Sequence, residues 1–299
     1  MGRRYWRRPQ LEPKHLLLPV KDIPVLNPQA VLRRYGLRAD RRLGQNFLHD
    51  KNSLEKIAFL AGIQNIDTVL EVGTGLGSLT RYLSIYAREV VTVELDGKLD
   101  PILQVVLKPY ENVRIMYGDI LRLSPSELKL PPDYIVAANI PYNITSAIIR
   151  HLLGSEAKPR RIVLTIQKEV AERICKSPPD MSLLALSVQV FGLPTIEDHI
   201  PAEAFFPAPR VDSAVVRIEI YPEPLISNTL LPVFFKLIKA GFGQKRKTLR
   251  NALTAGLKTT TSEVETLLNQ AGLDPQRRAE TLSLEEWGNL ADSFADQKV

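Results

Sequence analysis

The chain has 299 residues, of which 44% are hydrophobic and 24% are charged. This length suffices for one large domain and a smaller one, and the composition is typical of a globular protein. No apolar run is long enough to span a bilayer, the single cysteine excludes an internal disulfide, and four scattered histidines show no metal-ligand spacing. We therefore expect a cytoplasmic protein with no membrane span and no metal.

Basic residues gather at the N-terminus. The chain has a formal net charge of +6, but residues 1–42 hold eleven basic and three acidic side chains, a net charge of +8. The remaining 257 residues therefore sum to −2. Such a segment either binds a polyanion or is a solvated, disordered arm, and for residues 1–28 both interpretations stay open. We expect residues 1–40 to form a basic, flexible extension.

Helical and strand patterns alternate along the first two thirds of the chain. The expected strands are 67–72, 89–95, 112–119, 134–139 and 160–166, and the expected helices are 54–61, 78–87, 98–107, 145–153 and 168–175. Alternation of this kind predicts an α/β fold with a parallel sheet and right-handed crossovers. Two later apolar runs, 182–192 and 212–221, are expected to be the final strands of the sheet.

The segment Tyr221–Pro224, YPEP, marks a domain boundary because its two prolines interrupt regular structure. Beyond it, apolar residues recur at spacings of three and four, which predicts helices over 230–242, 247–257, 261–273 and 283–294. The sequence therefore predicts an α/β domain over residues 41–222 and a smaller, all-helical domain over residues 223–299.

Three glycines follow the first expected strand, in the stretch Leu70–Thr80, LEVGTGLGSLT. Gly73, Gly75 and Gly77 in a turn between a strand and a helix place backbone amides beside a ligand. The spacing matches neither the dinucleotide fingerprint nor a P-loop. A tight structural turn remains the alternative if the loop is considered alone.

Polar side chains end the next three strands. Glu94 ends the second strand, Asp119 the third and Asn139 the fourth. The carboxyl ends of parallel strands share one edge of the sheet, so these residues and the glycine turn should form one crevice. A carboxylate at the position of Glu94 is suited to accept hydrogen bonds from two ribose hydroxyls. One acid at a strand end is usually only solvated, but three polar ends in succession favour a ligand site.

The stretch NIPYNI, residues 139–144, indicates the reaction. The amino nitrogen of adenine is a poor nucleophile because its lone pair is delocalised into the ring. The Asn139 side-chain oxygen and the Ile140 carbonyl are placed to accept its two hydrogens, Pro141 fixes the backbone direction, and Tyr142 offers a face on which a flipped base stacks. A plain turn after a strand is the alternative, and the preceding crevice weighs against it.

Together these motifs resemble the KsgA/RsmA family of rRNA adenine dimethyltransferases. The resemblance covers about residues 41–290 and includes, in order, LGQNFLHD (43–50), EVGTGLGSLT (71–80), VELD (93–96), GD (118–119), NIPYNI (139–144), QKEVAERI (167–174), PAEAFFPAPRVDSAVVRI (201–218) and QKRKTLRNAL (244–253).

The resemblance implies a class I, Rossmann-like methyltransferase fold, with S-adenosylmethionine as methyl donor and S-adenosylhomocysteine as product. It implies dimethylation of two adjacent adenosines near the 3′ end of small-subunit rRNA, within a pre-ribosomal small subunit, and we expect the enzyme to act as a monomer. Its role would lie in the biogenesis of that subunit.

The matching motifs also imply roles for individual residues. Asn46 and Leu48 would lie over the donor, and Gly73 and Gly75 would approach it. Glu94 would bind the ribose hydroxyls of the donor and Asp119 its adenine amine. Asn139 would line the same crevice and, with Ile140, Pro141 and Tyr142, serve the target base. Phe205 matches the family aromatic expected on the other side of that base, although the adjacent Phe206 leaves open which ring faces it.

A basic stretch near the C-terminus, QKRKTLRNAL, is the expected RNA contact. If it is helical, Leu249, Ala252 and Leu253 form an apolar arc, and Arg246, Lys247 and Arg250 form a basic arc beside it. Lys245 belongs to the same basic stretch. Two functional alternatives remain: methylation of large-subunit rRNA, or a non-catalytic RNA-binding or transcription factor on this fold. The presence of Glu94, Asn139 and Tyr142 disfavours the second.

Overall fold

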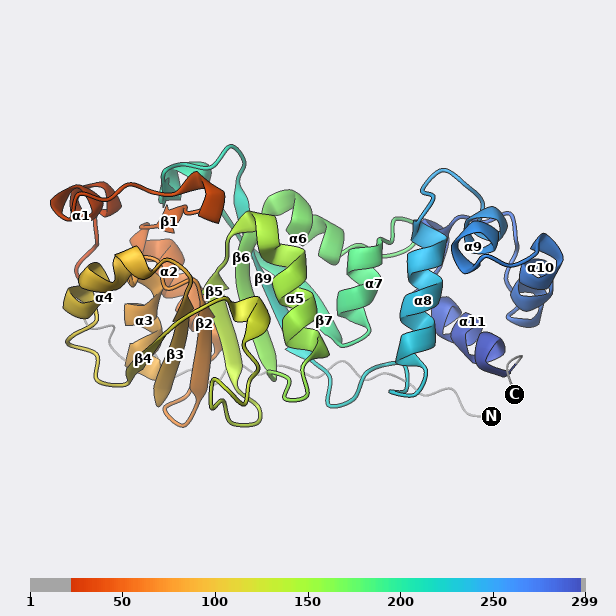
Figure 1. The fold of residues 1–299 in the computed structure, drawn as a ribbon, viewed down its shortest axis with the longest axis horizontal. Helices are drawn as coiled ribbons and strands as arrows, with labels where there is room; N and C mark the ends of the chain where they lie inside the picture. The colour runs from red at the N-terminus through yellow and green to blue at the C-terminus, as the bar shows by residue number, and fades with distance from the viewer. Residues whose placement is uncertain (1–22, 297–299) are drawn as a thin grey trace.

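A twisted sheet forms the centre of the computed structural model, which describes residues 23–296 (Figure 1). Its strand order is β4-β3-β2-β5-β6-β9-β7. The strands are β2 (Thr68–Val72), β3 (Glu89–Glu94), β4 (Val113–Tyr117), β5 (Ile135–Asn139), β6 (Arg161–Gln167), β7 (Gly192–Ile200) and β9 (Ser213–Ile220). Strands β2 to β6 run parallel, whereas β9 is antiparallel to both of its neighbours. The predicted α/β sheet is confirmed.

Helices cover both faces of this sheet. They are α2 (Lys51–Ala61), α3 (Ser78–Tyr86), α4 (Asp100–Val106), α5 (Thr145–Gly154), α6 (Lys168–Ile174) and α7 (Leu183–Gln189). Successive strand residues point to opposite faces, so Val69 and Ile135 pack with α2 and α3, whereas Leu70 and Val136 pack with α5, α6 and α7. Because both faces are covered, the parallel strands are mostly apolar on both faces rather than alternating, and polar members such as Glu71 and Thr92 are buried as well.

One predicted strand is a helix. Residues 183–189 form α7 instead of a sheet strand, and β7 follows at residues 192–200. Ser182 starts α7, because its side chain accepts a hydrogen bond at 3.0 Å from the amide of Ala185. The expected final strand at residues 212–221 is confirmed as β9.

A helical region follows the sheet and extends to one side of it (Figure 1). It consists of α8 (Leu231–Phe242), α9 (Leu249–Leu257), α10 (Thr261–Gln270) and α11 (Leu284–Asp296). Phe234 and Leu237 of α8 and Trp287 of α11 are completely buried, in an apolar cluster that continues to the sheet through α7. Within residues 23–296, no helix combines the length and apolar composition that crossing a bilayer requires.

The segment before α2 packs on the sheet, contrary to the expectation of a flexible extension over residues 1–40. Helix α1 (Pro28–Arg34) begins at Asn27, whose side chain accepts from the amide of Ala30, and Leu32 is 3% exposed in an apolar cluster with residues of α4. That expectation is therefore wrong from residue 23 onward, because burial of side chains such as Leu32 holds the segment in place. Residues 1–22 lie outside the described part of the chain.

A short ribbon joins this segment to a distant part of the chain. The two-residue strand β1 (Phe47–Leu48) pairs antiparallel with β8 (Phe205–Phe206), so that Phe47 lies opposite Phe206 and Leu48 opposite Phe205. The 3₁₀ helix η1 (Arg41–Leu43) precedes β1. These elements lie along the upper side of the sheet in Figure 1.

Candidate active site

The glycine turn between β2 and α3 forms the floor of a pocket. Gly73 and Gly75 have φ angles of +79° and +56°, in the left-handed region that glycine adopts without strain. A Cβ atom on Gly75 would lie 3.1 Å from the Phe47 ring, and one on Gly73 would lie 3.8 Å from the carbonyl oxygen of Asn139. The turn therefore lets two neighbouring segments approach closely, but its amides are not free as the sequence suggested, because Gly73 donates to the carbonyl of Val93 and Gly75 to the carboxylate of Glu94, both at 2.8 Å.

Glu94 is held in a fixed position at the end of β3. One carboxylate oxygen accepts from the amide of Gly75 and the other from the amide of Asp96, both at 2.8 Å. Burial raises the pKa of Glu94, while these two backbone donors oppose the shift. A carboxylate offers about four lone-pair positions, so two acceptor positions remain for hydroxyl groups of a ligand.

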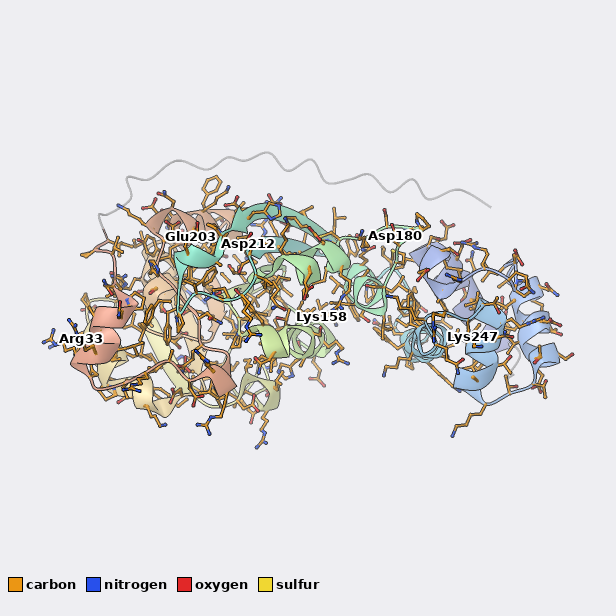
Figure 2. The ribbon with its side chains drawn as sticks, turned by 90° about the horizontal axis from the view of Figure 1, so that it is seen from above. Arg33, Lys158, Asp180, Glu203, Asp212 and Lys247 are labelled. Carbon is orange, nitrogen blue, oxygen red and sulfur yellow. The ribbon has the colours of Figure 1, made fainter. Side chains whose placement is uncertain are left out.

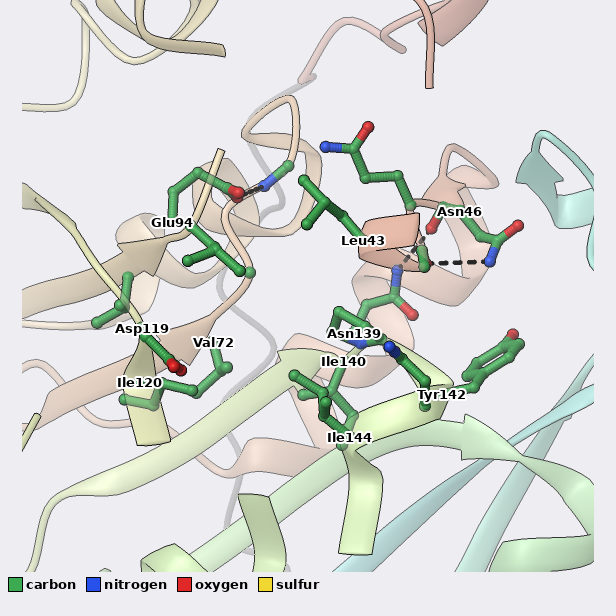
Figure 3. Close-up of a pocket in the computed structure, with 18 of the residues that line it drawn as sticks. Leu43, Asn46, Val72, Glu94, Asp119, Ile120, Asn139, Ile140, Tyr142 and Ile144 are labelled. Atoms are coloured by element: carbon green, nitrogen blue, oxygen red, sulfur yellow. Dashed lines mark hydrogen bonds between the residues drawn. The ribbon is translucent and has the colours of Figure 1, made fainter. Parts of the chain in front are cut away.

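The pocket runs across the carboxyl ends of β2, β3 and β5 and encloses about 990 Å³, including its open mouth. Glu94 and Asp119 lie toward one end, and Asn139 and Tyr142 toward the other (Figure 3). This edge contains the point at which the strand order reverses, between β2 and β5. Ligands of open α/β sheets bind at such a reversal.

The amide group of Asn139 has one defined orientation. Its Nδ2 donates to the backbone carbonyl of Asn46 at 3.1 Å. A carbonyl oxygen only accepts, so the nitrogen of the amide must be on that side, and Oδ1 is on the other side as an acceptor. Asn46 itself donates through Nδ2 to the carbonyl of Gly44 at 3.2 Å, which helps to fix the loop on which Asn139 depends.

A hydrogen bond at the hydroxyl group of Tyr142 fixes the orientation of its ring. Its Oη lies 2.6 Å from the Oγ of Ser213, a completely buried residue at the start of β9. Burial raises the pKa of the Tyr142 phenol, so the side chain is neutral near pH 7 and its ring is an aromatic surface rather than an anion. Figure 3 shows Tyr142 next to Asn139 at the end of the pocket remote from Glu94.

A glutamine closes the pocket from the N-terminal side. The side-chain oxygen of Gln45 accepts from the amide of Asp40 at 2.8 Å, and its nitrogen donates to Asp96 at 2.9 Å. The segment before β1 is therefore tied to the end of β3, across the Glu94 end of the pocket. Gln45 stands in the LGQNFLHD motif, but the sequence assigned it no role, because its partner Asp96 is 51 positions away.

Most of the residues expected from the sequence meet in this pocket. Those that line it are Asn46, Gly73, Gly75, Glu94, Asp119, Asn139, Ile140, Pro141 and Tyr142. Leu48 lines a smaller cavity behind the glycine turn instead. Phe205 is 2% exposed and packs among apolar residues with Leu48, so the structure does not bring its ring into the pocket.

The expected RNA-binding residues are in a loop and not on one continuous helix. Helix α8 ends at Phe242, and Thr248 starts α9 by accepting a hydrogen bond from the amide of Asn251. Lys245, Arg246 and Lys247 lie between the two helices and are exposed. Arg250, at the start of α9, forms an ion pair with Glu265 at 2.7 Å.

Sequence reasoning missed several apolar walls of the pocket. Leu43, Phe47, Leu95 and Ile120 all line it. Leu95 follows Glu94 directly and is 56% exposed. A single leucine at the end of a strand carries no binding motif, so the sequence did not identify it. A planar heterocycle would find apolar contacts here, between Leu95 and Ile120, next to the Asp119 carboxylate.

Comparisons with known proteins agree with this arrangement. A family model described as "Ribosomal RNA adenine dimethylase" matches residues 36–296. A protein of Dehalococcoides mccartyi named ribosomal RNA small subunit methyltransferase A is 46% identical over 278 residues, which cover 91% of this chain and 95% of the relative. A protein of the same name from Geobacillus kaustophilus is 39% identical over 275 residues, with 89% and 94% covered.

Two solved structures share the fold over most of the chain. A dimethyladenosine transferase from Plasmodium falciparum aligns with a TM-score of 0.72 and 25% identity, covering 85% of this chain and 98% of that one. The 23S rRNA methyltransferase ErmE aligns with a TM-score of 0.67 and 27% identity, covering 84% and 100%. The family match spans both the pocket and the helical region, and on this evidence the chain belongs to the ribosomal RNA adenine dimethylase family.

Proposed function

We propose that this enzyme dimethylates the amino groups of two adjacent adenosines near the 3′ end of small-subunit rRNA, with S-adenosylmethionine as donor. The relatives named above support the small subunit as the target. The observation that carries the proposal is the fixed amide of Asn139, whose Oδ1 is an acceptor in the pocket that Glu94 and Asp119 also line. The expected substrate is rRNA within a pre-ribosomal small subunit in the cytoplasm.

The residues of the pocket fit the proposed donor. Glu94 retains two acceptor positions for ribose hydroxyls, Leu95 and Ile120 offer apolar surfaces to an adenine, and Asp119 offers an acceptor to its amine. The methionine part would lie along the glycine turn, because Gly73 and Gly75 line the pocket without side chains. Bound there, S-adenosylmethionine supplies a methyl group already activated by its sulfonium, and S-adenosylhomocysteine is the product.

The residues at the other end of the pocket would prepare the target nitrogen. The Asn139 Oδ1 and the Ile140 carbonyl accept the two amino hydrogens, which draws the nitrogen away from planarity and directs its lone pair into the pocket. Pro141 keeps this carbonyl in place because its φ is restricted, and Tyr142 stacks on the base. Positioning alone supplies effective molarities of about 10⁵ M or more, so no strong base is required.

The second aromatic surface for the base is a separate part of the proposal. Phe205 corresponds to the family aromatic, but its ring is 2% exposed, so a base reaches it only after the β1–β8 ribbon shifts. Phe206 is half-buried and already has an accessible ring surface. We assign the stacking role to Phe205, which such a shift would expose. If Phe206→Ala lost methyltransferase activity while Phe205→Ala retained it, the assignment would be reversed.

We place the RNA-binding surface partly in the helical region. Lys245, Arg246 and Lys247 are exposed and face solvent, whereas Arg250 reaches phosphates only if its ion pair with Glu265 opens. We divide the chain at residues 40 and 222 into an N-terminal segment, a catalytic domain and a helical domain, and we propose that it acts as a monomer.

Primer extension on rRNA from a strain that lacks the gene tests the proposed function. Dimethylated adenosines block reverse transcription because both hydrogens of the pairing amine are replaced. We expect two adjacent stops near the 3′ end of small-subunit rRNA to be absent from the deletion strain and restored by the wild-type gene, but not by Asn139→Ala. Stops that change only in large-subunit rRNA would contradict the target.

A further inference from the structure

A groove lies beside the active site, between the N-terminal segment and the β8 end of the ribbon. One wall consists of α1 and the residues that follow it, and the other consists of Phe206 and Pro207. It encloses about 1040 Å³, including space open to solvent. The buried Leu32 of α1 contributes to its apolar floor.

Three arginines that line this groove have no carboxylate partner among the described residues. Arg33, Arg38 and Arg41 are exposed, and in the described residues 23–296 none of them forms an ion pair. The neighbouring Arg42, which does not line the groove, is paired with Asp40 at 3.0 Å. Among the described residues that line the groove none is acidic, so these residues form a site of positive potential suited to an anion.

The groove also contains an aromatic surface. The half-buried Phe206 ring lies at the wall opposite α1, within the same groove as the three guanidinium groups. Basic groups along a groove with an aromatic side chain in its wall are the combination by which proteins bind single-stranded nucleic acid, since cations contact phosphates and the ring stacks on a base. A purely electrostatic anion site would not need the ring.

The groove is connected to the active site by the two-stranded ribbon. Phe206 of the groove lies opposite Phe47 in the β1–β8 pairing, and Phe47 lines the active-site pocket. One strand of the ribbon therefore contacts the groove and the other contacts the pocket. The ribbon is therefore the structural link between the groove and the pocket.

We propose that this groove binds the single-stranded RNA segment next to the target adenosine, with Arg33, Arg38 and Arg41 on its phosphates and Phe206 against one of its bases. The inference rests on the proposed function, because it presupposes an RNA substrate in the adjoining pocket. Arg33 lies at one end of the molecule in Figure 2 and Lys247 at the other, so this contact is separate from the one expected in the helical region.

The test compares the triple variant Arg33→Gln/Arg38→Gln/Arg41→Gln with Arg34→Gln. Arg34 is the matched control, because it is exposed on the same helix but does not line the groove. The substrate is small-subunit particles from cells that lack the methylation, and KM is measured between about 50 and 200 mM salt. Calorimetric titration with S-adenosylmethionine checks that each variant retains its fold and donor site.

We expect the triple variant to raise KM about tenfold or more at the higher salt, with kcat and donor affinity unchanged. The slope of log KM against log salt should fall by about 0.7 for each lost phosphate contact on a single strand. Lysines at the three positions should restore much of the salt dependence. Phe206→Leu should raise KM by about fivefold or more, with the salt slope unchanged, because it removes a stack and no charge.

A triple variant with the KM and salt slope of Arg34→Gln would overturn the proposal. Failure of the proposed function has a different signature, since the wild-type enzyme would then transfer no methyl groups to these particles. A triple variant with reduced kcat but unchanged KM would also contradict it, because the groove would then affect the reaction rather than the binding of RNA.

Discussion

The side-chain amide of Asn139 donates a hydrogen bond through Nδ2, and its oxygen points away from that bond. The bond from Nδ2 to the Asn46 carbonyl leaves Oδ1 for the target amine. Asn139→Ala removes a preorganised acceptor, and losses of this kind cost about 10²-fold or more in rate. We expect methyl transfer to fall by at least that factor in a single-turnover assay. Donor affinity by calorimetry should change little, and its loss would show that Asn139 serves the donor instead.

Glu94 is the residue on which donor binding should depend most strongly. Two hydrogen bonds between its carboxylate and ribose hydroxyls are at stake, and each charge-assisted bond contributes roughly 1.5–3 kcal/mol. We expect Glu94→Ala to weaken S-adenosylmethionine binding at least tenfold in a calorimetric titration. An unchanged dissociation constant would mean that Glu94 only fixes the Gly75 turn through the 2.8 Å bond and that the donor lies elsewhere.

Glu71 couples stability to pH. It is 1% exposed and accepts from the hydroxyls of Thr80 at 2.6 Å and Thr92 at 2.9 Å. Burial raises the pKa of Glu71 to about 8, although the two hydroxyls oppose the shift. The folded protein therefore retains a proton that the unfolded chain releases near pH 4.5, so this stabilisation is complete below that pH and is lost as pH rises toward 8.

Urea unfolding at pH 5, 6.5 and 8 measures this coupling. The wild-type free energy of unfolding should fall relative to that of Glu71→Gln, by at most about 1.4 kcal/mol for each pH unit in this window. The amide variant is the matched control because it has a similar size and no proton to release. Parallel pH profiles for the two proteins would show that Glu71 is ionised in the folded state.

At the scale of elements, the basic residues in and after the loop between α8 and α9 are of two kinds, exposed ones on the loop and one that forms an ion pair on α9. Lys245, Arg246 and Lys247 are exposed on the loop, whereas Arg250 is paired with Glu265. Reversing the three loop charges to Glu should weaken binding to small-subunit particles and flatten the salt dependence by about 0.7–0.9 in log–log slope for each lost contact. Filter binding across a salt series measures both quantities.

The matched control for this loop is Arg250→Gln. We expect it to change the salt slope little, because its charge is already compensated within the helical region. Donor affinity should remain unchanged in both variants. The hypothesis of an RNA-binding loop would be abandoned if the triple variant had the wild-type slope and affinity.

Elements with a clear hydrophobic period were predictable from the sequence, and those that depend on distant partners were not. The strands from β2 to β6 are apolar runs between turn signals, and the structure confirms each of them. Residues 183–189 form a short and mostly apolar run, so their pattern does not distinguish a helix from a buried strand. The capping side chain of Ser182 was the local signal that would have separated the two.

The same distinction holds for the site: residues at the ends of regular strands were predictable, and those placed by distant partners were not. Glu94, Asp119 and Asn139 were predictable because strand ends meet at one edge of a parallel sheet. The β1–β8 ribbon joins residues far apart in the chain through two pairs only, and no periodicity reveals it. Phe205, which is buried, and Phe206, which is half-buried, both belong to this ribbon, which explains why the sequence left the two rings unresolved.

At the scale of the whole molecule, basic surfaces occur at both ends of an elongated protein. Figure 2 places Arg33 and Lys247 at opposite ends, with the sheet between them. An RNA that contacts both ends must be large and folded. We therefore expect a short hairpin with the two target adenosines to be methylated with a KM at least tenfold above that of small-subunit particles, and equal KM values would show that only the pocket binds RNA.

The central claim is tested most directly by locating the methyl groups. Purified enzyme is incubated with S-adenosylmethionine and a mixture of unmethylated small and large ribosomal subunits, and the rRNA is then digested and analysed by mass spectrometry. The account predicts dimethyladenosine at two adjacent nucleotides near the 3′ end of small-subunit rRNA, and none with Asn139→Ala. Dimethyladenosine in large-subunit rRNA, or no transfer to either subunit, would contradict it.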